Sequence, residues 1–590
     1  MMLSSHARTL CAGPKSFNSA RSQRLKAKKL YPSIDTNITS YDRKDPFGAL
    51  DTLRKLLSSL TTRVGGCQLK LTPEEHKLSV HLLTIVEPFV GTAPSRRSFM
   101  RQPTEILDEI VSHIDSKRDL FALAISCKRM HSVIFPRHYD YRTIRCKISN
   151  IAVWGHLAKN RALALNVRRL EILDERSSAP LCIPPDMLTT DTELESSDDE
   201  LEMHNKQERL FISALTRMNR LNEFIWSCNH SLVSLENVLP TLLKCQTLKS
   251  VEINDNLIFA PGSEQEDNAH QSRNSSVLPQ LSSVTVRSIK KGYGQSKVPR
   301  LQKVSRMLHQ CPNLEVLDIN YSGSPGIANP FADDLFLFGR WPCLRSLNLT
   351  HLSCTLEGID AATTFFAAHA NIEVLHLDVG PRSNVTNLVL HPGSFPRLRE
   401  LKSSKELACA IMTCPLDSAN PRPIETIKGV RLTGQGRDLS FFNALRRHTV
   451  KRIELDAYGE FDDIKRLIEC SPKVTWLDIG KKGSISPHKG PVTIQSVVDW
   501  ANLLTQLPDL TTFHGVPFFY EVSSGSTNFM SNVSLSDRSR IKKNDEVTSI
   551  LAWKCPNLRR LDHWDGHAGK VIILSRVGDK VKWEVRRVRA

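Results

Sequence analysis

The sequence predicts a mixed α/β fold in which a short helical segment leads into a long array of strand–helix repeats. About ten copies of one apolar pattern recur between residues 221 and 479, and residues 99–146 follow a different, helical pattern. The composition, with 40% hydrophobic and 24% charged residues, is close to the globular average and excludes a wholly disordered chain. The 590 residues therefore predict one small module and one long repeat domain.

Most of the net charge of +17 lies at the two ends of the chain. Residues 1–100 carry 16 basic and 7 acidic side chains and residues 537–590 carry 14 and 7, whereas residues 101–536 carry 49 and 48. A neutral body argues against a nucleic-acid partner for the protein as a whole. Residues 1–98 are predicted to be a basic leader, largely disordered or partly helical. We expect a cytoplasmic and/or nuclear location, with a mitochondrial transit peptide as the alternative interpretation of the acid-poor start.

Neither membrane insertion nor metal binding is supported by the sequence. No apolar stretch approaches the roughly 20 residues of a membrane helix, and no secretory signal pattern is present. The 14 cysteines include no CxxC pair, so we expect no metal, no disulfide framework and no cofactor. Cys311 and Cys555 each precede a proline and a repeat strand, and we expect them to cap the buried ends of helices. No P-loop, HExxH or GxSxG pattern occurs, so we predict no catalytic residue and no enzyme.

Residues 99–146 are predicted to form three short helices. Pro103 marks the start of the first helix, Asp119 is expected to cap the second, and the third is expected to stop at Pro136. Apolar residues at helical spacing give each helix one buried stripe. These residues are Ile106, Leu107, Ile110, Ile114, Leu120, Leu123, Ala124, Met130, Val133 and Ile134.

The repeats have the spacing L-x-x-L-x-I, as in Leu314, Leu317 and Ile319. Steps of 24 to 33 residues separate the copies, within or near the 20–29-residue period of leucine-rich repeats. The last two apolar residues share one face of a short strand, and the return segment is helical, so the units must stack. Residues 147–570 are therefore predicted to form an irregular leucine-rich-repeat solenoid shaped like a horseshoe. The central repeat positions are residues 224, 251, 284, 317, 347, 375, 401, 427, 453 and 477.

Three polar segments interrupt the array and are predicted to be loops: residues 186–206, 255–276 and 521–546. The first contains seven acidic residues between Asp191 and Glu202. It is interpreted as a solvated loop, with acid-directed phosphorylation at Ser196 or Ser197 as the alternative. Residues 571–590 alternate between apolar and charged side chains around a Gly-Asp bend, which predicts a C-terminal β-hairpin.

The helical segment contains an ordered motif: Pro103-x-Glu105-Ile106-Leu107-x-x-Ile110, Arg118-Asp119-Leu120-x-x-Leu123, Ser126-Cys127-Lys128-Arg129 and Pro136-x-x-Tyr139. This segment resembles an F-box, and with the repeats behind it the whole chain resembles fungal F-box/leucine-rich-repeat proteins. The resemblance implies docking to the Skp-type adaptor of a cullin ubiquitin ligase complex. The chain departs from the family pattern at Gln102, where a leucine is usual, and at Met130, where an aromatic residue is usual. The adaptor-contacting residues that the resemblance implies are Pro103, Ile106, Leu107, Ile110, Leu120 and Leu123.

The resemblance further implies a non-catalytic substrate-recognition subunit of an SCF-type E3 ubiquitin ligase, whose repeats bind an unknown substrate protein for ubiquitination. Three alternatives remain open. The helical segment can be an ordinary cap of the solenoid, the chain can be a scaffold outside a ligase, or it can be a nucleic-acid-associated protein that uses its basic ends. The candidates for substrate contact, which can instead be packing residues, are Trp226, Tyr321, His376, Tyr458 and Trp476.

Overall fold

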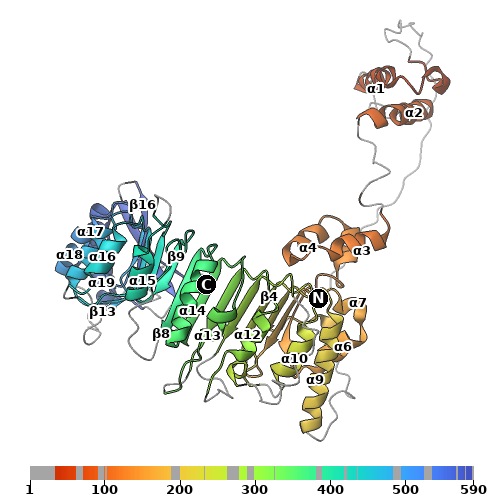
Figure 1. The fold of residues 1–590 in the computed structure, drawn as a ribbon. Helices are drawn as coiled ribbons and strands as arrows, with labels where there is room; N and C mark the ends of the chain where they lie inside the picture. Colours follow the sequence, from red (N-terminus) through yellow and green to blue (C-terminus); the bar gives the residue numbers. More distant parts are fainter. Residues whose placement is uncertain are drawn as a thin grey trace. The chain divides into compact units, whose positions relative to one another are not determined.

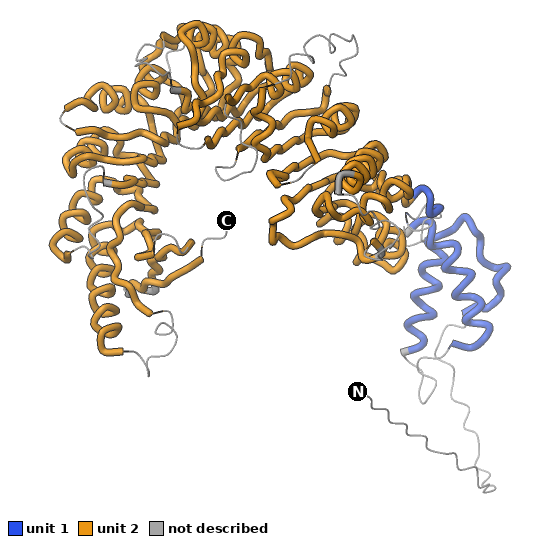
Figure 2. Tube along the Cα trace, turned by 90° about the horizontal axis from the view of Figure 1, so that it is seen from below, with its two compact units in different colours: residues 1–106 blue, residues 107–590 orange. Residues whose placement is uncertain are grey.

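The chain forms two compact units, residues 1–106 and residues 107–590 (Figure 2). The second unit is a mixed α/β structure (Figure 1). The computed structural model describes residues 34–61, 71–90, 99, 102–187, 200–230, 233–261, 278–288, 298–323, 326–380, 389–416, 421–434, 436–482, 493–523, 534–565, 569–578 and 580–587.

The first unit contains a pair of helices, α1 (Pro46–Thr61) and α2 (Pro73–Val90), after a short 3-10 turn, η1 (Ile38–Ser40). Each helix begins with a proline, whose missing N–H costs nothing in the first turn. Buried apolar residues of α2 pack against Ala49 of α1. The helices fall within the predicted leader, and residues 1–33, which carry its basic start, lie outside the described residues. The buried residues of α2 are Leu78, Leu82, Ile85 and Val86.

Three short helices follow, as predicted: α3 (Thr104–Ser112), α4 (Lys117–Ala124) and α5 (Lys128–Ile134). The Ser116 hydroxyl caps α4 by accepting from the N–H of Asp119 at 3.3 Å, so the predicted cap at Asp119 was one turn too late. Cys127 is the N-cap residue of α5, and its sulfur accepts from the N–H of Met130 at 3.4 Å. The boundary predicted at residue 146 was also too late, because the first strand begins at Thr143.

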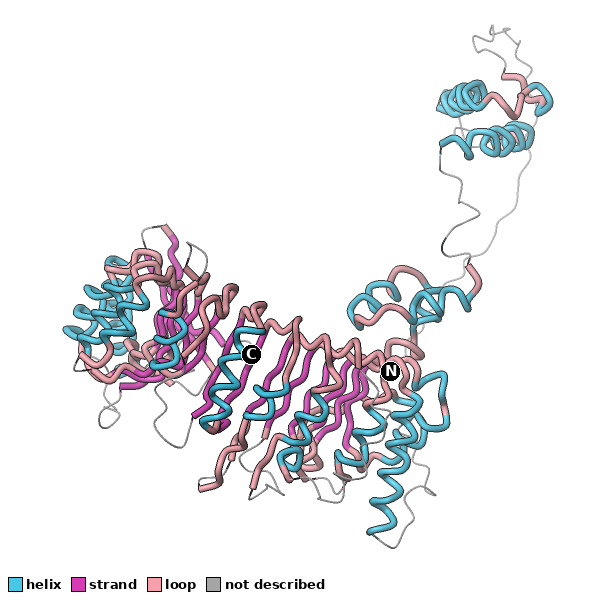
Figure 3. Tube along the Cα trace, in the orientation of Figure 1, coloured by secondary structure: helices cyan, strands magenta, loops and turns pink. Residues whose placement is uncertain are grey.

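In the described part of the chain, 17 strands form one sheet (Figure 3). Successive strands from β1 to β15 pair in parallel as nearest neighbours, apart from the two-residue β13, which pairs beside β12 on β11. The strands are β1 (Thr143–Lys147), β2 (Arg169–Leu173), β3 (Glu223–Trp226), β4 (Ser250–Asn254), β5 (Ser283–Arg287), β6 (Val316–Asn320), β7 (Ser346–Ser353), β8 (Val374–Gly380), β9 (Glu400–Ser403), β10 (Thr426–Arg431), β11 (Arg452–Tyr458), β12 (Trp476–Asp478), β13 (Lys481–Lys482), β14 (Thr512–His514) and β15 (Arg560–Asp562).

The central apolar residues of the repeats lie in register across the sheet. Leu317 pairs with Leu347, and Leu347 pairs with Leu375. The same column continues towards the N-terminus through Leu170 to Ile144, two units that the sequence pattern had not revealed. A one-residue slip would move every side chain to the other face, so this alignment fixes which residues are buried.

Helices return the chain between strands and cover one face of the sheet, and the opposite face is called the open face below (Figure 3). Their apolar stripes and the inward strand residues form one continuous core. The helices and turns are α6 (Ile151–Lys159), α7 (Arg161–Ala164), η3 (Pro185–Met187), α9 (Glu200–Arg217), α10 (Leu235–Leu242), η4 (Asn256–Phe259), α12 (Gln302–Leu308), α13 (Asp333–Phe338), α14 (Leu356–Ala368), α15 (Lys405–Thr413), α16 (Leu439–Leu445), α17 (Phe461–Cys470), α18 (Ile494–Leu504) and α19 (Leu535–Lys554).

All three predicted loops are partly helical, since a 3-10 turn, η4, occupies Asn256–Phe259 inside the segment predicted as 255–276. Helix α9 begins at Glu200, inside the segment predicted as 186–206, and α19 begins at Leu535, inside the segment predicted as 521–546. Polar side chains dominated both segments, and the helices bury only one side of their length. Ser196 and Ser197 lie outside the described residues.

The C-terminal hairpin is present as β16 (Lys570–Val577) and β17 (Lys580–Arg587). Strand β16 also pairs antiparallel with β15, so the hairpin extends the sheet beyond the last repeat. Trp583 packs near Phe519 and Trp564 and donates its indole N–H to Asp545 of α19 at 2.9 Å. The hairpin therefore covers the end of the apolar core.

Candidate functional site

The residues that the F-box resemblance assigned to the adaptor divide between the interior and the surface. The side chains of Leu107 and Leu120 have no exposed area, because they form the core of the three-helix segment. Ile106 and Ile110 are 49% and 39% exposed. Pro103 is exposed and Leu123 is half-buried.

Two pairs of apolar side chains on the segment face solvent. Ile106 and Ile110 lie one turn apart on α3. Phe121 and Ile125 lie one turn apart on and directly after α4, and they are 48% and 68% exposed. Sequence reasoning missed Phe121 and Ile125, although their spacing of four residues was a signal for a second helical face.

The two departures from the family pattern have different surroundings. Met130 is fully buried on α5. Gln102 precedes α3 and is half-buried. Phe99 is 43% exposed, and Met100, its neighbour in the sequence, lies outside the described residues.

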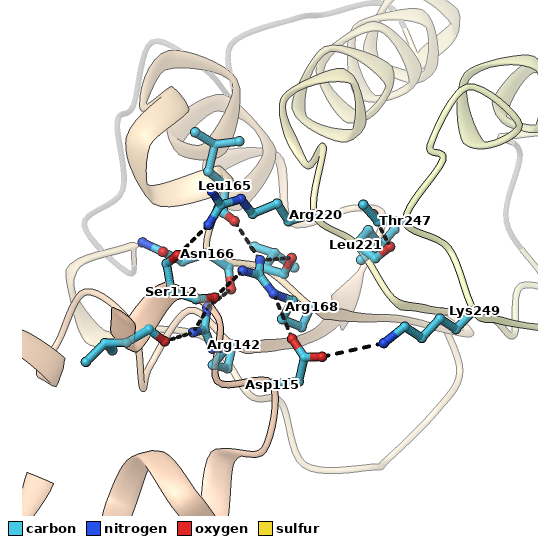
Figure 4. A network of polar contacts seen from close by, with 12 residues as sticks. Ser112, Asp115, Arg142, Leu165, Asn166, Arg168, Arg220, Leu221, Thr247 and Lys249 are labelled. Atoms are coloured by element: carbon cyan, nitrogen blue, oxygen red, sulfur yellow. Dashed lines mark hydrogen bonds and ion pairs between the residues drawn. The ribbon is translucent and has the colours of Figure 1, made fainter. Parts of the chain in front are cut away.

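Three arginines attach the end of α3 to the first repeats, and they are called the arginine clamp: Arg142, Arg168 and Arg220 (Figure 4). Each arginine lies in the turn that precedes a strand, β1, β2 or β3. Arg142 donates through Nη2 to the carbonyl oxygen of Val111 at 2.7 Å, and Arg168 donates through Nη2 to that of Ser112 at 2.7 Å. The last carbonyls of a helix lack partners within the helix and carry its negative dipole end, so arginine satisfies both needs.

Further bonds complete the clamp. Arg142 reaches the carbonyl oxygen of Asn166 at 3.0 Å, and Arg220 donates to the Ser112 hydroxyl at 2.5 Å. Asp115, just after α3, accepts from Arg168 Nε at 3.2 Å and lies 3.7 Å from Lys249 Nζ (Figure 4). Arg142 and Arg168 are only 1% and 6% exposed. Burial lowers the pKa of Arg142 to about 10, which still leaves it charged at neutral pH.

Three of the five candidate substrate residues are packing residues. Trp226 is fully buried and donates its indole N–H to the buried carboxylate of Asp255 at 3.0 Å. Tyr321 is 1% exposed, with its ring centroid 5.1 Å from that of Phe259. Tyr458 is also buried.

The other two candidates, His376 and Trp476, lie on the open face of the sheet. His376 shares Glu400 Oε1 with Lys428, at 2.9 Å and 2.6 Å. Partial burial pushes the pKa of Glu400 upward, but the hydrogen bonds from Lys428 and His376 outweigh it and leave this pKa below its usual value.

Trp476 lies beneath two guanidinium groups. The Arg452 group on β11 is 4.0 Å from a Trp476 ring centroid, and the Arg560 group on β15 is 5.3 Å away. Thr512 lies between Trp476 and Arg560 in the register, and its short side chain leaves room for the longer arginine. Trp476 Nε1 is buried and has no hydrogen-bond partner among the described residues. Tryptophan and arginine are the side chains that most often dominate protein interfaces.

The described residues were searched for groups that could hold a metal ion and for helices that could cross a membrane. No group of three or more histidine, cysteine or acidic side chains is placed to hold a metal ion there. Burial raises the pKa of Cys311 to about 12, and its thiol donates to the carbonyl oxygen of Met307 at 3.3 Å near the end of α12. Among these residues, no helix combines the length and apolar character needed to cross a membrane.

A scan against protein-family models and a search of curated proteins found no match to this chain.

Proposed function

We propose that the chain is a non-catalytic substrate receptor of an SCF-type ubiquitin ligase. In this proposal residues 99–146 are an F-box that binds a Skp-type adaptor, and the parallel strand–helix units are leucine-rich repeats that bind the substrate. The support is the F-box-like motif, the three short helices formed by it, and the in-register repeats directly behind it.

The observation that carries the proposal is that the three-helix segment exposes apolar side chains while the arginine clamp fixes the end of its first helix on the first repeats. Ile110, Phe121 and Ile125 are 39%, 48% and 68% exposed, so covering their exposed part in a partner groove contributes roughly half of the about 1.5–3 kcal/mol that burying a whole apolar side chain gives. The clamp fixes the end of α3 on the first repeats through buried, charge-assisted hydrogen bonds. A partner bound to the helices is therefore held at a defined position relative to the open face.

The mechanism needs no reacting group in this chain. A receptor that holds its substrate close to the activated ubiquitin converts an encounter in solution into an intramolecular one. The rate gain comes from effective concentration, which depends on how rigidly the two binding surfaces are connected. The buried clamp supplies such a connection at the base of the repeats.

The test is co-purification of the full chain with a Skp-type adaptor. Ile110→Asp and Phe121→Asp each place a charge on the exposed apolar side chains, and each is expected to reduce adaptor binding at least tenfold. Leu356→Asp is the matched control, since Leu356 is 72% exposed on α14, away from the three-helix segment. Equal binding by the wild type and both variants would contradict adaptor docking through these side chains, and absence of binding by the wild type would favour a scaffold outside a ligase.

A further inference from the structure

A polar pocket of about 290 Å³ lies on the open face across five strands, β7 to β11. Its lining includes His351 and His376, the charged side chains of Asp378, Lys402 and Asp456, and the hydroxyl-bearing end of β9. His376 is one of the residues that the sequence suggested for substrate contact. The pocket therefore lies within the surface where the proposed function places the substrate.

Two irregularities in the strands border this pocket. The pairing of β7 with β8 shifts register between Thr350 and Leu352, and His351 between them has a φ of 57°. The pairing of β10 with β11 shifts after Lys428, at Gly429, which has a φ of 78°. A bulge re-aims side chains and bends its strand, and it is common next to functional sites. Positive φ at a histidine also costs energy that the surrounding structure must support.

Several charged side chains around the pocket are paired, but Lys402 on its central strand, β9, is not paired with any described residue. Glu400 binds both His376 and Lys428, and His351 Nε2 lies 3.4 Å from Asp378 Oδ2. Lys402 stands in register between His376 and Lys428, and no carboxylate of the described residues lies within ion-pair distance of it. Its stem is held close to Gly429, where an added Cβ would be 3.2 Å from Lys402 Cγ. Lys402 therefore offers a positioned, uncompensated positive charge.

An uncompensated negative charge lies further along the same pocket. Asp456 is exposed on β11, and in the described part of the chain it has no ion-pair partner. Lys402 is in register with Lys428, and Lys428 is in register with Glu454, two residues before Asp456. Two strand spacings of about 4.8 Å and a two-residue offset of about 7 Å separate the backbone positions of Lys402 and Asp456 by about 12 Å. An extended peptide covers this distance in three to four residues.

We propose that this pocket binds an extended peptide segment of the substrate that presents an anionic side chain to Lys402 and a cationic side chain to Asp456, three to four residues apart. The inference rests on the proposed function in naming the peptide as part of a ligase substrate. The open face supplies the complementary charges, and the bulges at His351 and Gly429 supply the recess.

The test uses the full chain on an array of 12-residue peptides, each with one anionic and one cationic residue on a Gly/Ser/Ala background. The two charges are one to six positions apart, in both orders, and the anionic residue is present as glutamate or as phosphoserine. We expect binding to peak at a separation of three to four residues in one order. A preference for glutamate or for phosphoserine distinguishes a carboxylate from a phosphate as the natural group at Lys402.

Charge reversal at the pocket provides the decisive comparison. Lys402→Glu and Asp456→Lys are each expected to reduce binding at least tenfold, and the double variant is expected to prefer the opposite order of charges. Lys465→Glu is the matched control, because Lys465 is exposed on α17 and not on the open face. Binding that ignores spacing, or that survives both single reversals, would overturn the proposal.

Adaptor binding separates this proposal from the proposed function. The pocket variants are expected to co-purify with the Skp-type adaptor as the wild type does, since they lie far along the sheet from α3 and α4. Charge-dependent peptide binding without adaptor binding would support the pocket proposal and contradict the ligase proposal. Adaptor binding without charge-dependent peptide binding would support the ligase proposal and contradict the pocket proposal.

Discussion

The guanidinium of Arg142 donates a hydrogen bond to the carbonyl oxygen of Val111, 2.7 Å away, and thereby connects the turn before the first strand with the last turn of α3. The two residues are 31 apart in the sequence, so the bond joins two differently built parts of the chain. Because Arg142 is almost fully buried, water cannot replace the guanidinium as a donor to these carbonyls. Together with the bonds from Arg168 and Arg220 to Ser112, this buried contact holds the end of α3 on the first strands.

Removal of this side chain should destabilise the base of the repeats. Arg142→Met keeps much of the volume but removes the guanidinium donor from the carbonyl oxygens of Val111 and Asn166, and we expect a loss of about 2–4 kcal/mol in unfolding free energy. Urea denaturation followed by tryptophan fluorescence measures this loss. Arg161→Met changes an exposed arginine of α7 and should stay within about 0.5 kcal/mol of the wild type. A loss no larger for Arg142→Met than for Arg161→Met would show that the clamp contributes little.

Two neighbouring residues of α4 should separate folding from adaptor binding. Leu120 is fully buried, so Leu120→Ala is expected to cost about 2–5 kcal/mol of stability through the cavity it leaves. Phe121 is 48% exposed, so Phe121→Ala should cost under about 1 kcal/mol and instead lower adaptor affinity about tenfold or more. Thermal denaturation and an adaptor titration, both performed on each variant, give the comparison. The interpretation fails if Phe121→Ala binds the adaptor normally while the wild type binds it tightly.

The repeats were predictable because the copies recur at a nearly constant spacing and because apolar residues alternate with polar ones within each strand. The central leucines at 317, 347 and 375 lie in one register, as their spacing implied. The first two units escaped notice because the chain between Leu170 and Phe224 is 54 residues long, about twice the usual step, and contains α9. Periodicity within the F-box-like segment likewise showed which residues are apolar, but could not distinguish a helix's own core at Leu107 from its solvent side at Ile110.

The parity of the strands explains the placement of four of the five candidate substrate residues; Tyr458 is the exception, because it lies five residues from the central Ile453 and is nevertheless buried at the end of β11. Trp226 and Tyr321 each lie an even number of residues from the buried central position of their strand, so both point into the core. His376 and Trp476 lie one residue from Leu375 and Leu477 and therefore point to the open face. The arginine clamp was beyond sequence reasoning, because its partners are backbone carbonyls, which leave no trace in the side-chain pattern.

The two tryptophans should consequently respond differently to the same substitution. Trp226→Phe leaves the buried Asp255 carboxylate without its indole donor, and we expect a loss of about 1–3 kcal/mol in unfolding free energy. Burial raises the pKa of Asp255, and because the indole N–H stabilises the ionised carboxylate, the loss should be larger above this raised pKa than below it. Trp476→Phe removes an indole N–H that has no partner among the described residues, and it should change stability by less than about 1 kcal/mol. Urea titrations of both variants provide the measurement, and equal losses would contradict this assignment of the two faces.

His369 should make the stability of the protein depend on pH just below neutrality. Its ring is buried, Nδ1 lies 2.6 Å from the carbonyl oxygen of Phe365, and Nε2 accepts the N–H of Trp341 at 3.0 Å. Only the neutral ring with its proton on Nδ1 satisfies both bonds, since a proton on Nε2 would face the N–H of Trp341. Burial is the main cause that lowers the pKa of His369 below 6.5.

The sign of the effect follows from the direction of this shift. Above the unfolded pKa of 6.5 both states are neutral at this ring, and the native contacts of His369 contribute fully. As the pH falls through 6.5 towards the lower folded value, the unfolded chain binds the proton first, so stability declines, by about 1.4 kcal/mol for each unit of pKa difference. Denaturation midpoints measured between pH 7.5 and 5 should therefore fall with pH. His369→Gln cannot titrate at this position and should make that dependence shallower, with the buried His138 and His563, whose pKa values are also lowered mainly by burial, supplying the remaining slope; a wild-type slope in His369→Gln would refute the assignment.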